Sequence, residues 1–211
     1  MNKKKAESII QKLDILYPQA DTQLVFHNHF ELLVSVMLSA QCTDKRVNAV
    51  TAELFKEYNT PEKMLMLTQE ELEKKIFSCG FYKNKAKNIK LCAKQVLENF
   101  NGEVPQTMGE LMSLAGIGRK SANVIMLEVF KNPQGIAVDT HAKRISNLIG
   151  LSSQKEPEKI EQDLLKIFPK EYLKDINHLL VWHGRNTCIA RKPKCETCPI
   201  KNLCNNYLNN K

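Results

Sequence analysis

The chain has 211 residues, 43% of them hydrophobic and 26% charged, and a formal net charge of +8 at pH 7. This hydrophobic content is ordinary for a globular protein and can supply a real core. No stretch approaches the roughly 18 consecutive apolar residues of a membrane span, which excludes a helical membrane protein. The excess of cations favours a polyanionic partner, although a basic but inert surface has the same composition.

Helical periodicity runs through the whole chain, and the strand signal is weak, so we predict an all-α fold. Apolar residues at helical spacing indicate a first helix over 3–16, which Pro18 ends. Thr43, Thr60 and Thr68 are typical helix caps with acidic residues close behind them. Further helical patterns cover residues 29–39, 44–57, 82–99, 107–113, 119–130, 140–148, 157–167 and 172–183.

A turn at residues 132–135, Asn-Pro-Gln-Gly, is the visible boundary in the chain. A cysteine-rich loop near the C-terminus must pack on other structure, and the helix over 3–16 is a candidate partner. We therefore expect two helical domains, one of them discontinuous. The N-terminus is charged and amphipathic and lacks the apolar segment of a signal peptide, so we expect a cytoplasmic protein.

A glycine-containing connection at 114–118 leads into the apolar helix expected over 119–130, and it resembles a helix–hairpin–helix motif. Gly116 and Gly118 would let the backbone turn tightly without a Cβ penalty. Their amides, with those of the next helical turn, can point at one phosphate and hold DNA without reading its sequence. Many helix–helix turns use glycine, so an ordinary turn is the alternative; the adjacent Arg119 favours phosphate binding.

Lys120 is the residue of this motif that carries potential chemistry. It falls in the first turn of a helix, beside Arg119 and ahead of an apolar stretch. The helix dipole, the neighbouring cation and burial all disfavour a charged ammonium. A neutral lysine amine is a nucleophile for Schiff-base formation. A solvated lysine that binds phosphate is an equally good interpretation of these local features.

The segment Ala-Val-Asp-Thr-His at 137–141 follows the turn and precedes a helical pattern. Asp139 is therefore a natural helix N-cap, and capping alone would explain it. A second interpretation has this carboxylate act on a sugar opposite Lys120, stabilising an oxocarbenium-like centre or activating the nucleophile. His141 is a weaker candidate, because a histidine at a helix start is more often structural.

Four cysteines near the C-terminus have the spacing C-x6-C-x2-C-x5-C. Four thiolates in so short a run indicate a compact loop around an iron–sulfur cluster or a structural zinc. Disulfides are the third alternative, and an odd total of seven cysteines argues against them. The spacing fits neither paired C-x2-C zinc ribbons nor ferredoxin runs. The four residues are Cys188, Cys195, Cys198 and Cys204.

The segments LAGIGRKSANVIM, AVDTH, HGRNTC and the four-cysteine run occur in the order and spacing of the endonuclease III family. The segments LLVSVMLSAQCTD and GFYKNKAKNI also look like parts of that family. The resemblance covers roughly residues 25–204, and the joint match is far more specific than any short piece of it.

This resemblance implies a six-helix domain over 21–132, with the helix–hairpin–helix at about 107–127. A second domain would combine 1–20 with 133–211 and carry a 4Fe-4S loop over 188–204. DNA would lie across the cleft between them, with a damaged base flipped out of the duplex. The implied activity is that of a base-excision-repair DNA glycosylase and AP lyase. It would act on oxidised or damaged pyrimidines and on abasic sites, as a monomer in a prokaryotic-type, nucleoid-associated setting.

By the same resemblance, Lys120 attacks the sugar C1′ and Asp139 is its carboxylate partner. The Schiff base would permit β-elimination, which nicks the strand 3′ to the lesion. Gln41 matches the residue that fills the hole left by the flipped base, and Phe81 lies where the family has a wedge between the opposite bases. The residues expected to contact DNA are Gln41, Phe81, Gly116, Gly118, Arg119 and His141.

Three positions depart from the family pattern. Ala115 stands where proline is frequent, which is expected to loosen the hairpin slightly, and Ser121 stands where threonine is common. Phe81 replaces an aliphatic residue, which leaves opposite-base preference open. A non-catalytic DNA-binding module and a monofunctional glycosylase that uses water are the competing functions; Lys120 with Asp139 argues against the first.

Overall fold

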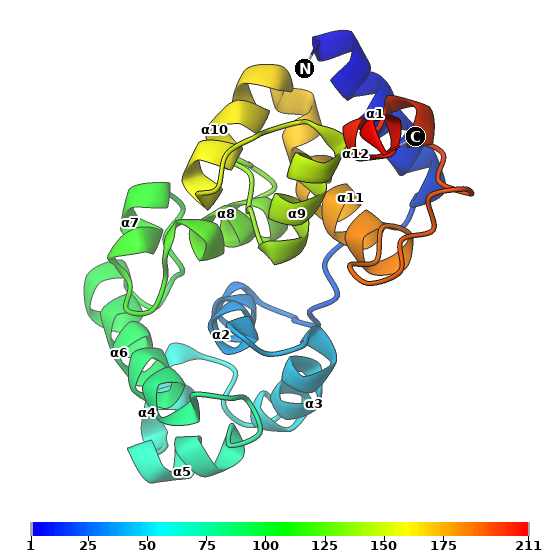
Figure 1. Cartoon of the computed structure of the whole chain (residues 1–211). Coiled ribbons are helices and arrows are strands. Elements are labelled where there is room, and N and C mark those ends of the chain that lie inside the picture. The colour runs from blue at the N-terminus through cyan, green and yellow to red at the C-terminus, as the bar shows by residue number, and fades with distance from the viewer. Residues whose placement is uncertain (1, 211) are drawn as a thin grey trace. The chain divides into compact units, whose positions relative to one another are not determined.

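The computed structural model describes residues 2–210, and the fold is all-helical as predicted, with no strand in that range (Figure 1). None of the helices in the described part of the chain is long and apolar enough to cross a membrane. The α-helices are α1 (Lys3–Leu16), α2 (His29–Ser39), α3 (Asp44–Leu54), α4 (Pro61–Met66), α5 (Gln69–Lys75), α6 (Tyr82–Phe100), α7 (Met108–Ser113), α8 (Arg119–Glu128), α9 (Thr140–Ile149), α10 (Pro157–Ile167), α11 (Leu173–Asn186) and α12 (Asn205–Asn209).

The helices fall into two compact units. One is continuous, covers Gln23–Asn132 and contains α2 to α8. The other joins Met1–Thr22 to Pro133–Lys211 and contains α1 with α9 to α12. Two 3₁₀ turns, η1 (Lys170–Tyr172) and η2 (Lys201–Leu203), belong to the discontinuous unit.

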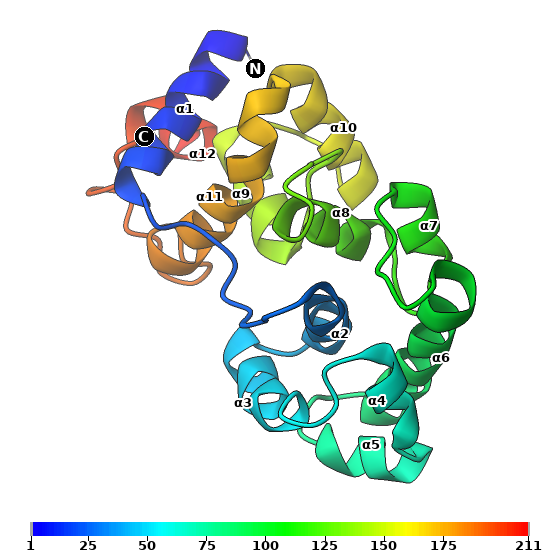
Figure 2. The same ribbon diagram turned by 180° about the vertical axis from the view of Figure 1, so that it is seen from behind.

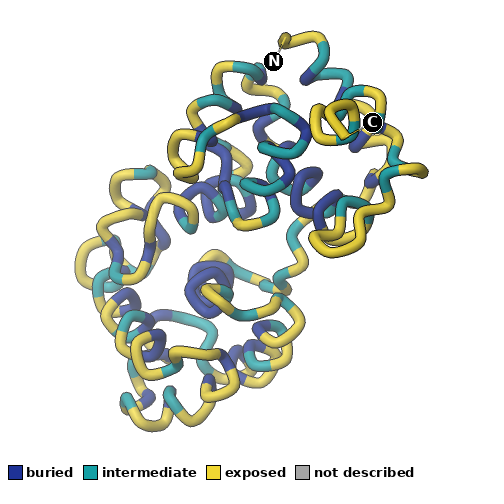
Figure 3. The backbone as a smooth tube through the Cα atoms, in the orientation of Figure 1, coloured by how far each residue is buried: buried dark blue, intermediate teal, exposed yellow. Residues whose placement is uncertain are grey.

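Helix α2 is the centre of the continuous unit, and every residue from 30 to 38 is buried (Figure 3). Helices α3, α6 and α8 pack on it. Such all-round burial explains why α2 is nearly uniformly apolar, whereas α6 has one apolar face. Helix α8 contributes Ala122, Ile125 and Met126, each 0% exposed. The helix that follows the hairpin is thereby anchored in this core.

Polar caps set the starts of several helices in this unit, as the sequence predicts. The side chains of Thr43, Thr60 and Thr68 each accept a hydrogen bond from a backbone N–H in the first turn. Thr68 forms a complete capping box with Glu71. Because the chain breaks at Leu67 and restarts at this cap, the described unit has seven α-helices where the resemblance implied six.

Several helix ends differ from the predictions. Helix α8 ends at Glu128 rather than at residue 130, and α11 ends at Asn186 rather than at residue 183. Helix α3 ends at Leu54 rather than at residue 57, because the chain leaves the helix at Phe55 and turns toward α4. Helix α6 ends at Phe100, and Asn101 then takes a left-handed conformation with φ 53°. The predicted terminators Gly102 and Pro105 lie just beyond this point. The short η2 and α12 were not predicted, because neither shows an apolar period.

The discontinuous unit is built on the pairing of α9 with α11, and α1 and α10 pack beside it (Figure 2). Helix α1 buries Ile9 and Leu13 in a core shared with Ile145 and Leu180. The predicted packing of the N-terminal helix against C-terminal helices is therefore observed, and it closes the unit across more than a hundred residues of sequence.

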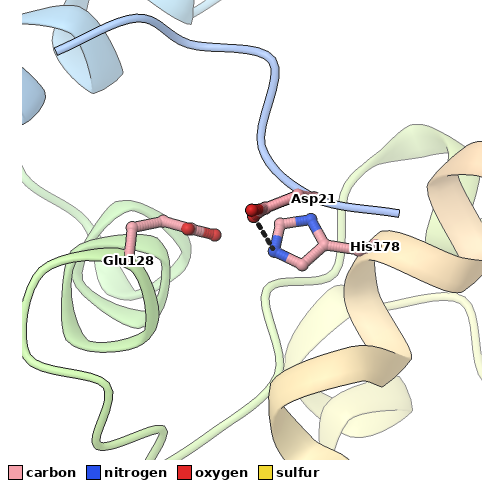
Figure 4. Close-up of side chains that lie close together, drawn as sticks. All are labelled: Asp21, Glu128 and His178. Carbon is pink, nitrogen blue, oxygen red and sulfur yellow. Dashed lines mark ion pairs between the residues drawn. The ribbon is translucent and has the colours of Figure 1, made fainter. Parts of the chain in front are cut away.

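Contacts to α11 hold the segment that follows α1. Trp182 donates from Nε1 to the carbonyl of Asp21 at 3.1 Å. The Nε2 atom of His178 lies 3.9 Å from an Asp21 carboxylate oxygen (Figure 4). Asp21 is largely exposed, so the ion pair adds little stability, but the indole hydrogen bond fixes the path of the chain.

Candidate functional site

The predicted hairpin joins α7 to α8 in the continuous unit. Gly116 has φ +79°, a region that side chains rarely adopt. An added Cβ there would lie 3.0 Å from Met37 Cε and 3.1 Å from Asn88 Cβ. Conformation and space therefore both require glycine at position 116.

Gly118 has a different role from the one predicted. Its backbone is extended, with φ −94° and ψ 175°, and an added Cβ would meet nothing within 4 Å. A residue with a Cβ atom would fit at this position. The prediction that the turn needs glycine at position 118 is therefore wrong. Gly118 is the N-cap of α8, and no side chain caps this helix start. The small cap leaves the first helical turn open to an approaching anion.

Ala115 makes a contact that a proline at this position could not make. Its backbone N–H donates to Gln95 Oε1 at 2.7 Å, a hydrogen bond that proline could not make. Gln95 also donates to the carbonyl of Ser113 at 3.3 Å. The α6 side chain thus contacts the backbone before and after Leu114 and holds the start of the turn to the body of the unit.

Lys120 is the second residue of α8 and is exposed, as is the preceding Arg119. Ser121 is half-buried, and the helix becomes buried from Ala122 onward. The predicted burial of Lys120 is therefore wrong: burial begins only beyond Ser121, and the long side chain is available to a ligand. Its backbone belongs to a helix that is anchored in the core. A rigid helix of this kind can fix the position of a nucleophile relative to a bound substrate.

Gln41 and Phe81 lie in the left-handed region, with φ 53° and φ 57°. Gln41 follows α2, and Phe81 is the N-cap of α6; both side chains are exposed, Phe81 at 65%. A left-handed backbone is costly for residues other than glycine, most of all for a bulky one, and such positions cluster at functional sites. Sequence periodicity gave no sign of this conformation.

Asp139 and His141 belong to the discontinuous unit, at the start of α9. Asp139 accepts a hydrogen bond from the Ala142 N–H at 2.7 Å, which confirms the predicted N-cap. One of its carboxylate oxygens is occupied in this way. The Nδ1 atom of His141 is buried and has no hydrogen-bond partner within the described structure. It faces close packing, because a Cβ added to Gly184 would lie 3.1 Å from this nitrogen.

The four C-terminal cysteines form a second centre in the same unit. All four are free thiols, and all four are half-buried. They line one cavity of about 290 Å³ together with Arg144. The structure thus brings together the residues that the spacing predicted, and it pairs none of them as disulfides.

This cavity fits a group that binds thiolates. Burial raises the pKa of Cys188 and of Cys198, so these thiols lose their protons readily only when a cation takes the proton's place. Arg144 supplies positive charge, with Nη1 3.9 Å from Cys188 Sγ and 2.7 Å from the Cys188 carbonyl. Cys204 Sγ is 3.7 Å from the carbonyl of Leu148. The four cysteines would hold a cluster, and binding of such a group would be coupled to folding of the loop.

Residues remote in sequence support this centre. The Tyr17 hydroxyl is 2.6 Å from Thr187 Oγ1 and 3.3 Å from His183 Nδ1, and His183 Nε2 is 3.9 Å from Cys198 Sγ. Burial, with Arg144 nearby, lowers the pKa of His183 to about 4, so its imidazole is neutral near neutral pH. No spacing rule connects α1 to this network, so sequence analysis missed Tyr17 and Arg144.

Comparison with known proteins agrees with this fold and these centres. Residues 34–170 match the family model of the HhH-GPD superfamily of base excision DNA repair proteins. Residues 188–204 match the iron–sulfur binding domain of endonuclease III. The fold and centres therefore define a helix–hairpin–helix DNA repair protein with an iron–sulfur loop.

Individual relatives place the chain more narrowly. It is 45% identical to endonuclease III of Escherichia coli K12 over 204 residues, which cover 97% of this chain and 96% of the relative. It is 43% identical to endonuclease III of Bacillus subtilis over 205 residues, covering 97% and 93%. The structure of a trapped endonuclease III–DNA covalent intermediate matches with a TM-score of 0.94 and 40% identity, covering 100% of this chain and 99% of that one.

The chain belongs to the endonuclease III family. Its four-cysteine loop is the binding site of a 4Fe-4S cluster, and DNA is its macromolecular partner.

Proposed function

We propose that this enzyme removes oxidised pyrimidines from duplex DNA with Lys120 as the nucleophile and Asp139 as its carboxylate partner. The class of enzyme follows from the family: a DNA N-glycosylase and AP lyase of base excision repair. The observation that carries the proposal is the exposed Lys120 in the first, uncapped turn of α8, next to a hairpin whose Gly116 is required. A damaged base must leave the duplex for the amine to reach C1′.

The chemistry then follows in order. The amine of Lys120 attacks C1′ as the bond to the base breaks, and positive charge develops on the sugar. Asp139 stabilises that charge or accepts the proton that the amine loses. Opening of the C1′–O4′ bond of the sugar ring converts the C1′ adduct into an imine. The imine acidifies the C2′ hydrogen, and loss of this proton expels the 3′ phosphate, so β-elimination breaks the strand 3′ to the lesion. Water then releases the enzyme.

The DNA contacts come from the hairpin and from Gln41 and Phe81, the two residues with a left-handed backbone. Gly116, Gly118 and Arg119 hold a phosphate at the α8 N-terminus, where the helix dipole favours an anion. Gln41 and Phe81 fill the duplex where the damaged base leaves it. The net charge of +8 supports this sequence-independent grip. We infer that the enzyme works in the cytoplasm, close to the nucleoid, because its proposed substrate is chromosomal DNA. We also propose that it acts as a monomer.

Excision from duplexes that each carry one defined lesion tests the substrate class. We expect release of oxidised pyrimidines and cleavage of abasic sites, and little release of oxidised purines. Efficient purine release with poor pyrimidine release would contradict the proposed class while leaving the enzyme type intact. Varying the base opposite the lesion in the same panel shows how Phe81 affects opposite-base preference.

Asp139→Asn separates chemistry from structure at that position. Asparagine also caps helices, so α9 and the melting temperature should be retained. Loss of the carboxylate should slow single-turnover base release by roughly 10²- to 10⁴-fold. Base release at the wild-type rate would show that Asp139 only caps α9. Asp139→Ala is the control in which the cap is lost as well.

Gln41→Ala tests the proposed wedge. The Gln41 side chain is exposed, so stability should hold, and alanine at φ 53° is strained to a similar degree. The complex in which the damaged base has left the duplex should lose the contact made by Gln41. The complex with undamaged duplex does not make this contact. We expect single-turnover excision to slow about tenfold, with a smaller change in binding to undamaged DNA. Equal excision rates would remove Gln41 from this role.

A further inference from the structure

Lys85 in α6 is a buried lysine that the proposed chemistry does not use. It is 7% exposed, although lysine is seldom buried without a partner. Burial lowers the pKa of its side chain, so the charged form is costly at this position unless nearby groups compensate. A side chain buried to this extent does not reach a DNA phosphate. If Lys85 serves the reaction, it therefore does so through the residues that it contacts.

The side chain of Lys85 contacts the C-terminal end of α2. Its Nζ atom donates to the carbonyl of Leu38 at 2.8 Å. Leu38 is the penultimate residue of α2, and the last turn of this helix contains no basic residue of its own. The carbonyl end of a helix carries partial negative charge and acceptors without an intrahelical donor, and a lysine can satisfy both. Lys85 therefore caps the end of α2 from another helix.

The backbone of Lys85 contacts the residue at the start of α6. Its N–H donates to the carbonyl of Phe81 at 3.1 Å, in the first turn of the helix. Phe81 is the N-cap of α6, with φ 57° and no side-chain cap. Lys85 therefore bonds through its main chain to Phe81 and through its side chain to the last turn of α2.

The turn that Lys85 caps leads directly into Gln41. Ala40 is the C-cap of α2, and Gln41 follows it with φ 53°. The next N–H along the chain, that of Cys42, donates back to the carbonyl of Ser39 at 3.1 Å. The position of Gln41 is therefore set by the last turn of α2. Loosening this turn would displace the Gln41 side chain, although Lys85 does not touch it.

We propose that Lys85 is a positioning residue for base excision, which holds the end of α2 against the start of α6 so that Gln41 and Phe81 enter the duplex together. The inference rests on the DNA contacts proposed above for these two residues. Loss of the bond to Leu38 should leave the hairpin and Lys120 in place, because α8 is anchored by its own buried residues. Excision should therefore suffer more than binding to undamaged duplex.

Lys85→Met removes the donor and leaves an unbranched side chain in the buried site. We expect single-turnover excision to slow about tenfold, as for Gln41→Ala, with a smaller change in binding to undamaged duplex. Lys85→Gln replaces this variant if methionine prevents folding; its side-chain nitrogen is one bond nearer the backbone, so it should show the same loss.

Lys90→Met is the matched control. Lys90 lies on the same helix, and its Nζ donates to the carbonyl of Leu67, the C-cap of α4. This variant also removes a lysine–carbonyl bond from α6, so its Tm should fall, but it should excise at the wild-type rate. An equal loss of excision in Lys90→Met and Lys85→Met would assign the effect to general destabilisation and overturn the proposal.

Two measurements separate positioning from a purely structural role. If Lys85 acts through Gln41, adding Lys85→Met to Gln41→Ala should slow excision further by less than about threefold, because the two substitutions remove one shared effect. Losses that multiply to about a hundredfold would show independent effects and overturn the proposal. Amide hydrogen exchange over residues 39–43 should be faster by about tenfold in Lys85→Met and unchanged in Lys90→Met. Unchanged exchange in Lys85→Met would overturn the proposal as well.

The same series distinguishes a failure of this inference from a failure of the proposed function. A wild type that does not excise, or a Gln41→Ala protein that excises at the wild-type rate, would show that the proposed function or the DNA contact of Gln41 is wrong, and the role of Lys85 would fall with it. Slow excision by Gln41→Ala together with wild-type excision by Lys85→Met would overturn the positioning role alone.

Discussion

Replacing Lys120 by alanine should abolish nearly all base release. In the proposed mechanism the Lys120 amine forms the bond to C1′, and an alanine methyl group cannot form a Schiff base. We expect single-turnover excision to fall by more than about a thousandfold, in the range seen when an enzyme loses its nucleophile. The side chain is exposed and α8 is anchored by buried residues further along, so folding and lesion-DNA binding should be retained.

Lys120→Gln controls for the loss of polarity and length. It should be as inactive as Lys120→Ala, because an amide nitrogen is not nucleophilic. Arg119→Gln removes the neighbouring cation and should weaken DNA binding without abolishing chemistry. A Lys120→Ala protein that released damaged base at near the wild-type rate would identify water as the nucleophile and make the enzyme a monofunctional glycosylase.

Replacing Cys198 by serine should remove the cluster and destabilise the discontinuous unit. Four half-buried thiols line the cavity, and ligand binding is coupled to folding of the loop. Loss of a metal centre belongs to the most damaging class of substitutions, about 4 kcal/mol or more. For a chain of this length such a loss lowers Tm by about 10 °C.

Iron and sulfide content, measured with thermal unfolding on anaerobically prepared protein, checks this result. The wild type should be brown and contain both elements, and Cys198→Ser should be colourless and melt earlier. Cys92→Ser is the control, since it removes a buried thiol from the other unit and should retain iron. A wild-type protein with one zinc and no iron would contradict the cluster assignment.

Local signals in the sequence predicted most of the fold. Apolar periodicity gave the α1, α2 and α9 boundaries almost to the residue, because each of these helices has a long buried face or stripe. Polar caps gave the helix starts at Asp44 and Thr140. The C-terminal helices were harder, because η2 and α12 are short and the cysteine loop dictates their course.

The candidate site was only partly predictable. Cysteine spacing and the hairpin motif are local and were visible, whereas the contacts that hold them are not local. Arg144 in α9 donates to the Cys188 carbonyl, and Gln95 in α6 accepts from the Ala115 N–H of the hairpin. The left-handed backbone of Gln41 was also hidden, because residues other than glycine adopt it only where surrounding packing imposes it.

Borohydride trapping tests the central claim most directly. Wild-type protein is incubated with a duplex that carries one oxidised pyrimidine, and the reductant converts any Schiff base to a stable bond. We predict a covalent protein–DNA adduct whose modified peptide maps to Lys120, and no adduct with Lys120→Ala. Efficient base release without any adduct, or an adduct that maps to another residue, would contradict the assignment of Lys120 as the nucleophile.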